Sequence, residues 1–368
     1  MERKRGAQWY AKFRLPDGRQ VQRKIGPAWT QRGRPAGGYF TKRMAEDWLA
    51  DVLAEARRGT LPGMVKTGAT FADAAAEYLR YIEHDRNRKP STVKGYRAML
   101  NARLLPTFGE TPIESITTEA IEDWLAGIDR KPETKRKALV LLHGVLERAR
   151  KLHRLPVNPA ADVEKPPLQR SGDIEVFSPE EVMALIRAAA SEQDAALFLT
   201  AAFTGLRRGE LLALRWRDVD FDGQTIRVRA SYTAGVVTTP KSGKVRSVPM
   251  APDVAAALAK VGQRKERTDD DDLVFVGRFG GHVNPPKLRK RYKAALERAG
   301  LRPLRFHDLR HTFGTRMIAK ADIRRVQEWM GHADVQTTMK YLHYAPREED
   351  AALVAEAFQV ERPVAAAR

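Results

Sequence analysis

Apolar and polar positions in the first sixty residues follow two different periods. Residues 8–14 (QWYAKFR) and 19–25 (RQVQRKI) are predicted to be strands, with Pro16-Asp17-Gly18 as the turn between them. Thr41 is placed to cap a helix that ends at Gly59. Its apolar residues recur at helical spacing: Met44, Ala45, Trp48, Leu49, Val52, Leu53 and Ala56. The pattern predicts a small strand–strand–helix module.

A helical block follows, after a short Gly- and Pro-containing link. Thr70 and Asp73 are spaced as a capping box at the start of its first helix. The apolar face of this helix is formed by Phe71, Ala74, Ala75, Tyr78, Leu79 and Ile82. A second helix is expected to open at Ser91, and two more around 121–128 and 134–152. Short helices of this kind form a compact bundle.

The third region begins after residues 157–167, whose prolines predict a linker. Ser178, Pro179 and Glu181 have the spacing of a capped helix start. Beyond them, helices surround short strands expected at 225–229, 236–239, 245–249 and 273–276. The predicted fold is therefore multidomain and mainly α. It has a small α+β module (1–62), a helical domain (68–165) and a mainly α domain with a small antiparallel sheet (175–368).

Composition narrows the functional classes. The chain of 368 residues contains no cysteine, which excludes thiol catalysis and thiolate metal sites and fits a reducing compartment. We find no apolar run near the ~20 residues of a membrane span and no secretory signal, so we expect a cytoplasmic protein with no membrane partner.

Charge points to a polyanionic partner. The formal net charge is +19, and the first 67 residues carry 15 Lys and Arg against 6 Asp and Glu. Such a field attracts nucleic acid, and a small basic sheet can enter a DNA groove. The alternatives are a basic protein without a particular partner and, for the N-terminal module, a role in oligomerisation only.

Four clusters in the C-terminal half carry candidate chemistry. They are Thr204-Gly205-Leu206-Arg207-Arg208-Gly209-Glu210, Thr239-Pro240-Lys241-Ser242-Gly243-Lys244-Val245-Arg246, His307-Asp308-Leu309-Arg310-His311, and the stretch from Met330-Gly331-His332 to Tyr341-Leu342-His343. The second is predicted to be a tight turn between two strands. His332 lies 22 residues after Arg310, and Tyr341 follows nine residues later.

In this order and at this spacing, the clusters resemble those of the tyrosine recombinase (phage integrase) family. The resemblance is strong over about 175–345 and weaker in the helical block, which is similar to the family's core-site-binding domain. Residues 1–60 resemble the arm-site-binding modules of phage-type integrases. The departures are small: Met330 replaces the usual Leu, and Pro240 precedes the lysine.

The resemblance implies a site made of Arg207, Lys241, His307, Arg310, His332 and Tyr341. The two arginines would bind the scissile phosphate, and Tyr341 would be the nucleophile that forms a 3′-phosphotyrosyl link. His307 is the candidate general base, His332 a hydrogen-bond donor to the phosphate, and Lys241, preferred over Lys244, the acid that protonates the leaving 5′-hydroxyl. We expect no cofactor, metal or ATP.

The implied function is a recombinase of the integrase type that integrates or excises a mobile element such as a phage. Its expected partners are double-stranded DNA attachment sites and three further copies of the chain in a DNA-bound homotetramer; accessory DNA-bending or excision factors are compatible with this. A short amphipathic helix at 348–358 is expected to dock on a neighbouring protomer or on its own domain.

Rival interpretations stay open. A chromosome-dimer-resolving recombinase or a type IB topoisomerase would share the chemistry, and a catalytically silent DNA-binding regulator would share only the fold. His307 and His311 match a zinc-binding H-x-x-x-H pair, but Asp308 stands where a zinc protease needs glutamate and no third ligand is evident. The segment 277–281 lacks the spacing and lysine of a phosphate-binding loop, and His311 is expected to be structural.

Overall fold

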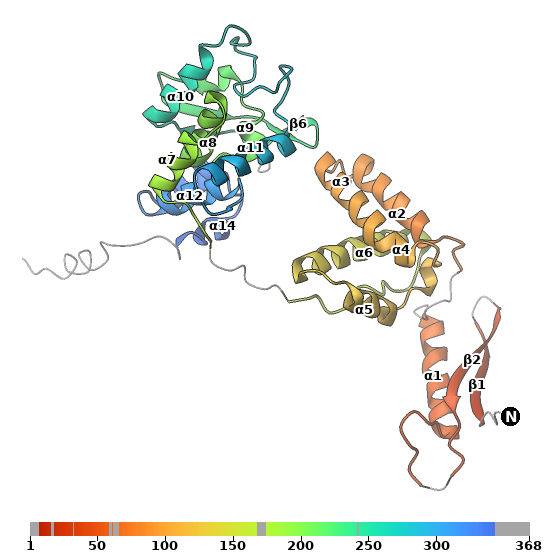
Figure 1. Cartoon of the computed structure of the whole chain (residues 1–368). Coiled ribbons are helices and arrows are strands. Elements are labelled where there is room, and N and C mark those ends of the chain that lie inside the picture. The colour runs from red at the N-terminus through yellow and green to blue at the C-terminus, as the bar shows by residue number, and fades with distance from the viewer. Residues whose placement is uncertain are drawn as a thin grey trace, which may run out of the picture. The chain divides into compact units, whose positions relative to one another are not determined.

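The chain folds into two units, Met1–Arg170 and Ser171–Arg368, in the computed structural model (Figure 1). The structure describes residues 7–15, 18–31, 33–58, 61, 66–167, 174–240 and 243–342. Helices dominate both units, and the strands form small antiparallel sheets, as the sequence predicts. None of the described helices is long and apolar enough to cross a membrane.

The N-terminal part of the first unit is a two-stranded antiparallel hairpin with a helix on it: β1 (Gln8–Arg14), β2 (Gln20–Pro27) and α1 (Lys42–Arg58). The Thr41 hydroxyl accepts a hydrogen bond from the Met44 backbone N–H at 3.2 Å, so the predicted cap is confirmed. Met44 itself is exposed, which corrects its expected place on the apolar face. Pro16, Asp17 and Gly59 lie outside the described residues.

The rest of this unit is a helical bundle with its own core. Its helices are α2 (Phe71–Arg80), α3 (Pro90–Met99), α4 (Leu105–Phe108), α5 (Thr118–Gly127) and α6 (Pro132–His153), with π-helical turns at Tyr81–Asp85 and Leu100–Leu104 and a 3₁₀ turn at Ile113–Ser115. The Thr70–Asp73 capping box is present. The helix expected at Ser91 begins at Pro90, because the fixed φ of proline suits the first helical position. Ala160 and Val163 pack into the core, so the linker expected at 157–167 is partly integrated into the bundle.

The second unit contains the four sequence clusters. Its helices are α7 (Pro179–Arg187), α8 (Glu192–Thr204), α9 (Arg208–Leu211), α10 (Pro252–Gly262), α11 (Pro285–Arg298), α12 (Asp308–Ile318), α13 (Ile323–Met330) and α14 (Gln336–Met339), with a 3₁₀ turn at Trp216–Asp218. Ser178 and Glu181 form the predicted capping box. Helix α8 is buried along most of its length and packs against α7, α10 and α12.

Two small sheets accompany these helices. One has the order β3 (Val219–Asp220), β4 (Thr225–Val228) and β7 (Arg246–Pro249); the other pairs β5 (Ser231–Thr233) with β6 (Val236–Thr238). Strands β6 and β7 flank the turn expected around Lys241, but they belong to different sheets, so their expected pairing as a hairpin is wrong. The strand expected at 273–276 is also wrong: Leu273 and Val276 make only isolated bridges.

The expected division into three domains stays a prediction. The module of β1, β2 and α1 and the helical bundle have separate hydrophobic clusters but belong to one unit by their contacts.

Candidate active site

The turn after α8 places the first predicted arginine. Gly205 ends the helix in the left-handed conformation with φ of 62°, and a Cβ there would lie 2.5 Å from the ring of Phe313 on α12. Only glycine fits this close approach without a shift. Arg207 then caps α9, and its Nη2 donates to the carbonyl of Gly331 at 2.9 Å. The turn therefore joins the first cluster to the last one.

A buried carboxylate, Glu210, organises this region. It accepts hydrogen bonds from the backbone N–H of Arg207 (2.8 Å), from Nη1 of Arg207 (3.0 Å) and from both terminal nitrogens of Arg246 (3.1 and 2.7 Å). Burial by itself raises the pKa of Glu210, but the hydrogen bonds from Arg246 and the charges of Arg246 and Arg207 outweigh it, so the pKa lies below its usual value. Glu210 is thus held as a carboxylate that orients two guanidinium groups.

Arg310, the second predicted arginine, lies on α12 with only 3% of its surface exposed. It donates to the carbonyls of Gly205 and Met330, each at 2.5 Å. Burial and the charge of Arg207 lower the pKa of Arg310 to about 9, so the side chain remains a cation at neutral pH.

The C-terminal end of α13 collects three arginines. Arg246 donates to the carbonyl of Trp329 at 2.8 Å, and the next two carbonyls, of Met330 and Gly331, accept from Arg310 and Arg207. The last carbonyls of a helix have no intrahelical partner and form the negative end of its dipole, which favours cations. The three consecutive carbonyls at the end of α13 therefore set the spacing of the three guanidinium groups.

These cations make the site suitable for an anion. Glu210 is the one carboxylate that pairs with Arg207 or Arg246 among the residues the structure describes. A pocket of about 350 Å³ opens beside them and is lined in part by Lys244, Arg246 and His332. The positive charge that remains, in a partly buried setting, suits a phosphate group.

Tyr341 lies inside this cluster. It is 3% exposed, its ring packs against Gly314 and Met330, and its hydroxyl is 2.9 Å from Nδ1 of His311. Burial raises the pKa of Tyr341, while the positive charges of Arg310 and Arg207 act in the opposite direction. The phenol is therefore neutral in this structure.

Two further histidines complete the arrangement. His307 caps α12 and its ring meets the ring of His311 edge-on at 4.9 Å; partial burial and the charges of His311 and Arg310 lower the pKa of His307 to about 4. Nδ1 of His332 is 2.8 Å from the Thr338 hydroxyl, and its ring lies parallel to that of Tyr341 at 6.2 Å. Burial and the charge of Arg310 lower the pKa of His332 to about 3. Both imidazoles are neutral at physiological pH, so each has a nitrogen that can accept a proton or a hydrogen bond.

Five of the six predicted site residues therefore come together, and the sixth, Lys241, lies outside the described residues, as do Tyr344 and the helix expected at 348–358. The contacts of Arg246 and Thr338 were not predicted from the sequence, and Glu210 was part of a predicted cluster but had no predicted role. It also expected His311 to be structural, whereas the structure places this ring against the Tyr341 hydroxyl. The sequence did contain a signal for a role of His311 in the site, because His311 directly follows Arg310.

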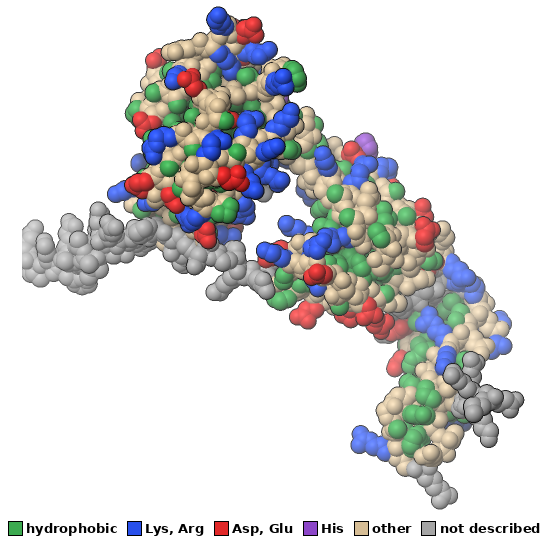
Figure 2. All heavy atoms as spheres, viewed as in Figure 1, with side chains coloured by type: hydrophobic (Ala, Val, Ile, Leu, Met, Phe, Trp, Pro, Cys, Tyr) green, Lys and Arg blue, Asp and Glu red, His purple; other side chains and the backbone are tan. Residues whose placement is uncertain are grey.

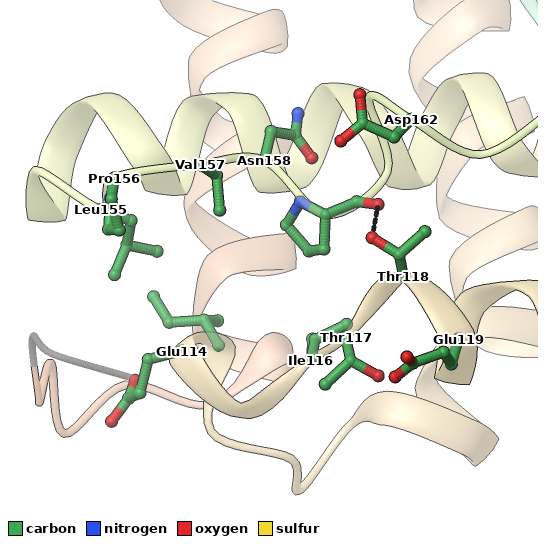
Figure 3. Close-up of a pocket in the computed structure, with 12 residues that line it drawn as sticks. Glu114, Ile116, Thr117, Thr118, Glu119, Leu155, Pro156, Val157, Asn158 and Asp162 are labelled. Carbon is green, nitrogen blue, oxygen red and sulfur yellow. Dashed lines mark hydrogen bonds between the residues drawn. The ribbon is translucent and has the colours of Figure 1, made fainter. Parts of the chain in front are cut away.

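The charge of the remaining surface and of a second pocket shows where else an anion could bind. Lys and Arg side chains are spread over the visible faces of both units (Figure 2). In contrast, a pocket of about 370 Å³ in the helical bundle is lined by apolar side chains, which include Ile116 and Leu155, and by the carboxylates of Glu114, Glu119 and Asp162 (Figure 3). These carboxylates repel phosphate, so this pocket does not suit a phosphate group.

Comparison with known proteins identifies the class. Residues 175–348 match the phage integrase family, and residues 70–128 match the phage integrase N-terminal SAM-like domain. Together these matches cover more than half of the chain, which therefore belongs to the phage integrase family of tyrosine recombinases.

Individual relatives agree with this assignment. The integrase of Mycobacterium phage D29 is 27% identical over 365 residues, which cover 95% of this chain and 96% of that protein. The Tn1549 transposon integrase in complex with transposon right-end DNA has a similar fold, with a TM-score of 0.62, 22% identity and coverage of 78% of this chain and 99% of that chain. A lambda integrase tetramer bound to a Holliday junction gives a TM-score of 0.61 at 18% identity and covers 90% of this chain and 92% of that chain.

Glu210 compensates two arginines in a buried setting, so its charge should matter for stability. Glu210→Gln removes the negative charge that compensates Arg207 and Arg246, so we expect the free energy of unfolding to fall by about 3 kcal/mol. Urea denaturation measures it. Glu297→Gln is the matched control, because Glu297 forms an exposed ion pair with Lys293, and its loss should change stability by no more than about 0.5 kcal/mol. Equal effects of the two substitutions would contradict the role given to Glu210.

Proposed function

We propose that the protein is a site-specific DNA recombinase of the integrase type, which cleaves and rejoins DNA through a covalent 3′-phosphotyrosyl bond to Tyr341. The observation that supports this most directly is a buried tyrosine hydroxyl inside a cluster of arginines and histidines. On this proposal the protein integrates or excises a mobile element such as a phage.

Phosphate binding is assigned to Arg207 and Arg310. A phosphodiester repels nucleophiles until its non-bridging oxygens are neutralised, and guanidinium groups do this with paired hydrogen bonds. The contacts of these arginines with the carbonyls of Gly331, Met330 and Gly205 hold the groups in place before DNA arrives. A site organised in advance stabilises the charge that develops in the transition state. His332 supports the same phosphate through Nε2, because its Nδ1 is engaged by Thr338.

Proton transfers complete the reaction. As the Tyr341 oxygen forms its bond to phosphorus, its proton passes to the general base, for which we propose the neutral ring of His307, while His311 orients the hydroxyl. The bond from phosphorus to the 5′-oxygen breaks, and Lys241 gives that oxygen a proton. Attack by a second 5′-hydroxyl reverses these steps on the new strand. Since one phosphoester replaces another, the exchange needs neither ATP nor a metal.

The assembly follows from this chemistry. Exchange between two duplexes cuts four strands, so four nucleophiles are needed, and we propose a homotetramer on double-stranded attachment sites. The Tn1549 and lambda relatives, which were captured on DNA, support this. Accessory DNA-bending factors would act with such a complex in the cytoplasm, and the 348–358 segment is a candidate contact between protomers.

Covalent capture tests the proposal. Incubation with a nicked duplex taken from the junction of the element and its flanking DNA should give a protein–DNA adduct that survives denaturing electrophoresis. Tyr341→Phe keeps the ring and its packing but removes the attacking oxygen, so it should bind this DNA with near-normal affinity and form no adduct. Tyr344→Phe is the matched control and should form the adduct.

Persistence of the adduct in Tyr341→Phe would overturn the assignment of the nucleophile. Absence of any adduct with the unmodified protein would favour a DNA-binding regulator without catalysis. The same assay compares the two histidines. We expect His307→Gln to lose more of the cleavage rate than His311→Gln, because His307 is the proposed general base and His311 orients the hydroxyl.

For residues 1–62 we propose an arm-type DNA-binding role, and for 68–165 and 175–368 the core-site-binding and catalytic roles. The excess of basic residues near the N-terminus supports the first of these, because phosphate contacts release counterions and strengthen binding.

Truncation and charge removal test the arm role. Deleting residues 1–60, or replacing the exposed Lys12, Arg14 and Lys24 by Gln in the full chain, should leave cleavage of a minimal core site intact. Both changes should weaken recombination of full-length sites and reduce the salt dependence of their binding. Filter binding at several salt concentrations measures this. Unchanged recombination of full-length sites by both variants would refute the arm role.

A further inference from the structure

The β5–β6 hairpin is a small element that stands apart from the main sheet. Its strands pair only with each other in the described part of the chain, at Ser231↔Thr238, Tyr232↔Val237 and Thr233↔Val236. Val236 and Val237 are 44% and 45% exposed. Isolated two-stranded hairpins are marginally stable, so the placement of this one depends on contacts outside its own hydrogen bonds.

The first such contact is with α9. A Cβ on Gly209 would lie 2.5 Å from the Ser231 hydroxyl and 2.9 Å from the carbonyl of Tyr232. Strand β5 therefore rests directly on the backbone of the helix that Arg207 caps.

The second contact is an aromatic stack. The ring of Tyr232 lies on the ring of His282 with centroids 4.0 Å apart and planes 9° from parallel. Burial and the charge of Arg215 lower the pKa of His282, so its imidazole is neutral at physiological pH. Its Nε2 is buried and makes no hydrogen bond to the described protein atoms. Burying this atom without a partner costs free energy, and the stacking on Tyr232 offsets part of that cost.

A rigid support holds His282. The backbone N–H of Gly277 donates to the carbonyl of Gly281 at 2.6 Å, and Val276 bridges to His282, which closes a tight loop. The side-chain amide of Gln193, on α8, both donates to and accepts from the backbone of Val276, at 3.0 and 2.9 Å. The stack therefore connects the hairpin to a buried core helix.

We propose that Tyr232 and His282 are positioning residues that fix the β5–β6 hairpin and, through it, the entry of the chain into the segment that carries Lys241. Lys241 is three residues beyond the end of β6 in sequence. An error in the hairpin's placement is thus transmitted to the proton donor. Arg310 and Tyr341 lie on other elements, and Arg207, although it caps the helix under β5, is held by Glu210 and by the carbonyl of Gly331. This inference rests on the proposed role of Lys241 as the acid.

The leaving group provides the test. With an ordinary nicked substrate, the P–O bond to the 5′-oxygen breaks and the oxygen needs a proton. With a 5′-bridging sulfur, the P–S bond breaks and the thiolate leaves without one. A defect in placing the acid should therefore appear only with the oxygen substrate, whereas general damage to the fold or to phosphate binding should appear with both.

We expect His282→Ala and Tyr232→Ala to slow single-turnover cleavage of the oxygen substrate about 2- to 13-fold, the rate equivalent of losing an aromatic pair worth about 0.5–1.5 kcal/mol. Both variants should cleave the sulfur substrate at the unmodified rate, as should Lys241→Ala. His282→Phe and Tyr232→Phe keep two flat rings in contact and are the matched controls, which should cleave both substrates normally.

Equal loss on the two substrates, or no loss on the oxygen substrate, would overturn the positioning role. Failure of sulfur to rescue Lys241→Ala would remove the acid assignment and this inference with it. If the unmodified protein cleaves neither substrate, the proposed function itself fails, which is a distinct result.

Discussion

Three guanidinium groups end on three consecutive carbonyls at the C-terminal end of α13, and the rest of the site depends on this arrangement. Trp329, Met330 and Gly331 accept from Arg246, Arg310 and Arg207. These arginines come from strand β7, helix α12 and the turn before α9, which are far apart in the sequence. One helix end therefore sets their spacing, and the negative end of its dipole offsets part of their repulsion.

Glu210 provides the remaining compensation without neutralising the site. It pairs with Arg207 and Arg246, while Arg310 is held by carbonyl groups alone in the described contacts. The chain leaves α13 through Gly331, whose φ of 63° suits glycine, and His332 follows at once beside the arginines. The same helix end thus holds the three arginines and leads directly to His332, whose ring lies parallel to that of Tyr341.

Local signals in the sequence predicted much of the fold. The capping boxes at Thr70 and Ser178 depend on residues three positions apart, and β1 and β2 follow one another directly in the sequence, so pattern alone suffices. The two- and three-residue strands β3 and β5 are too short to show an alternation, and the separation of β6 from β7 depends on tertiary pairing. The site was predicted through family resemblance. By contrast, the pairing of Arg246 with Glu210, 36 residues apart, and the contact of His311 with Tyr341 have no local sequence signal.

Peptide mapping identifies the residue through which the protein becomes attached to DNA, and we expect this residue to be Tyr341. Trypsin cleavage after Lys340 and Arg347 releases residues 341–347 (YLHYAPR), which contain both tyrosines of this region. After nuclease digestion of the covalent complex, fragmentation by mass spectrometry locates the residual nucleotide. We expect a nucleotide joined through its 3′-phosphate to Tyr341 and an unmodified Tyr344. A nucleotide on Tyr344, or on a residue outside this peptide, would contradict this assignment.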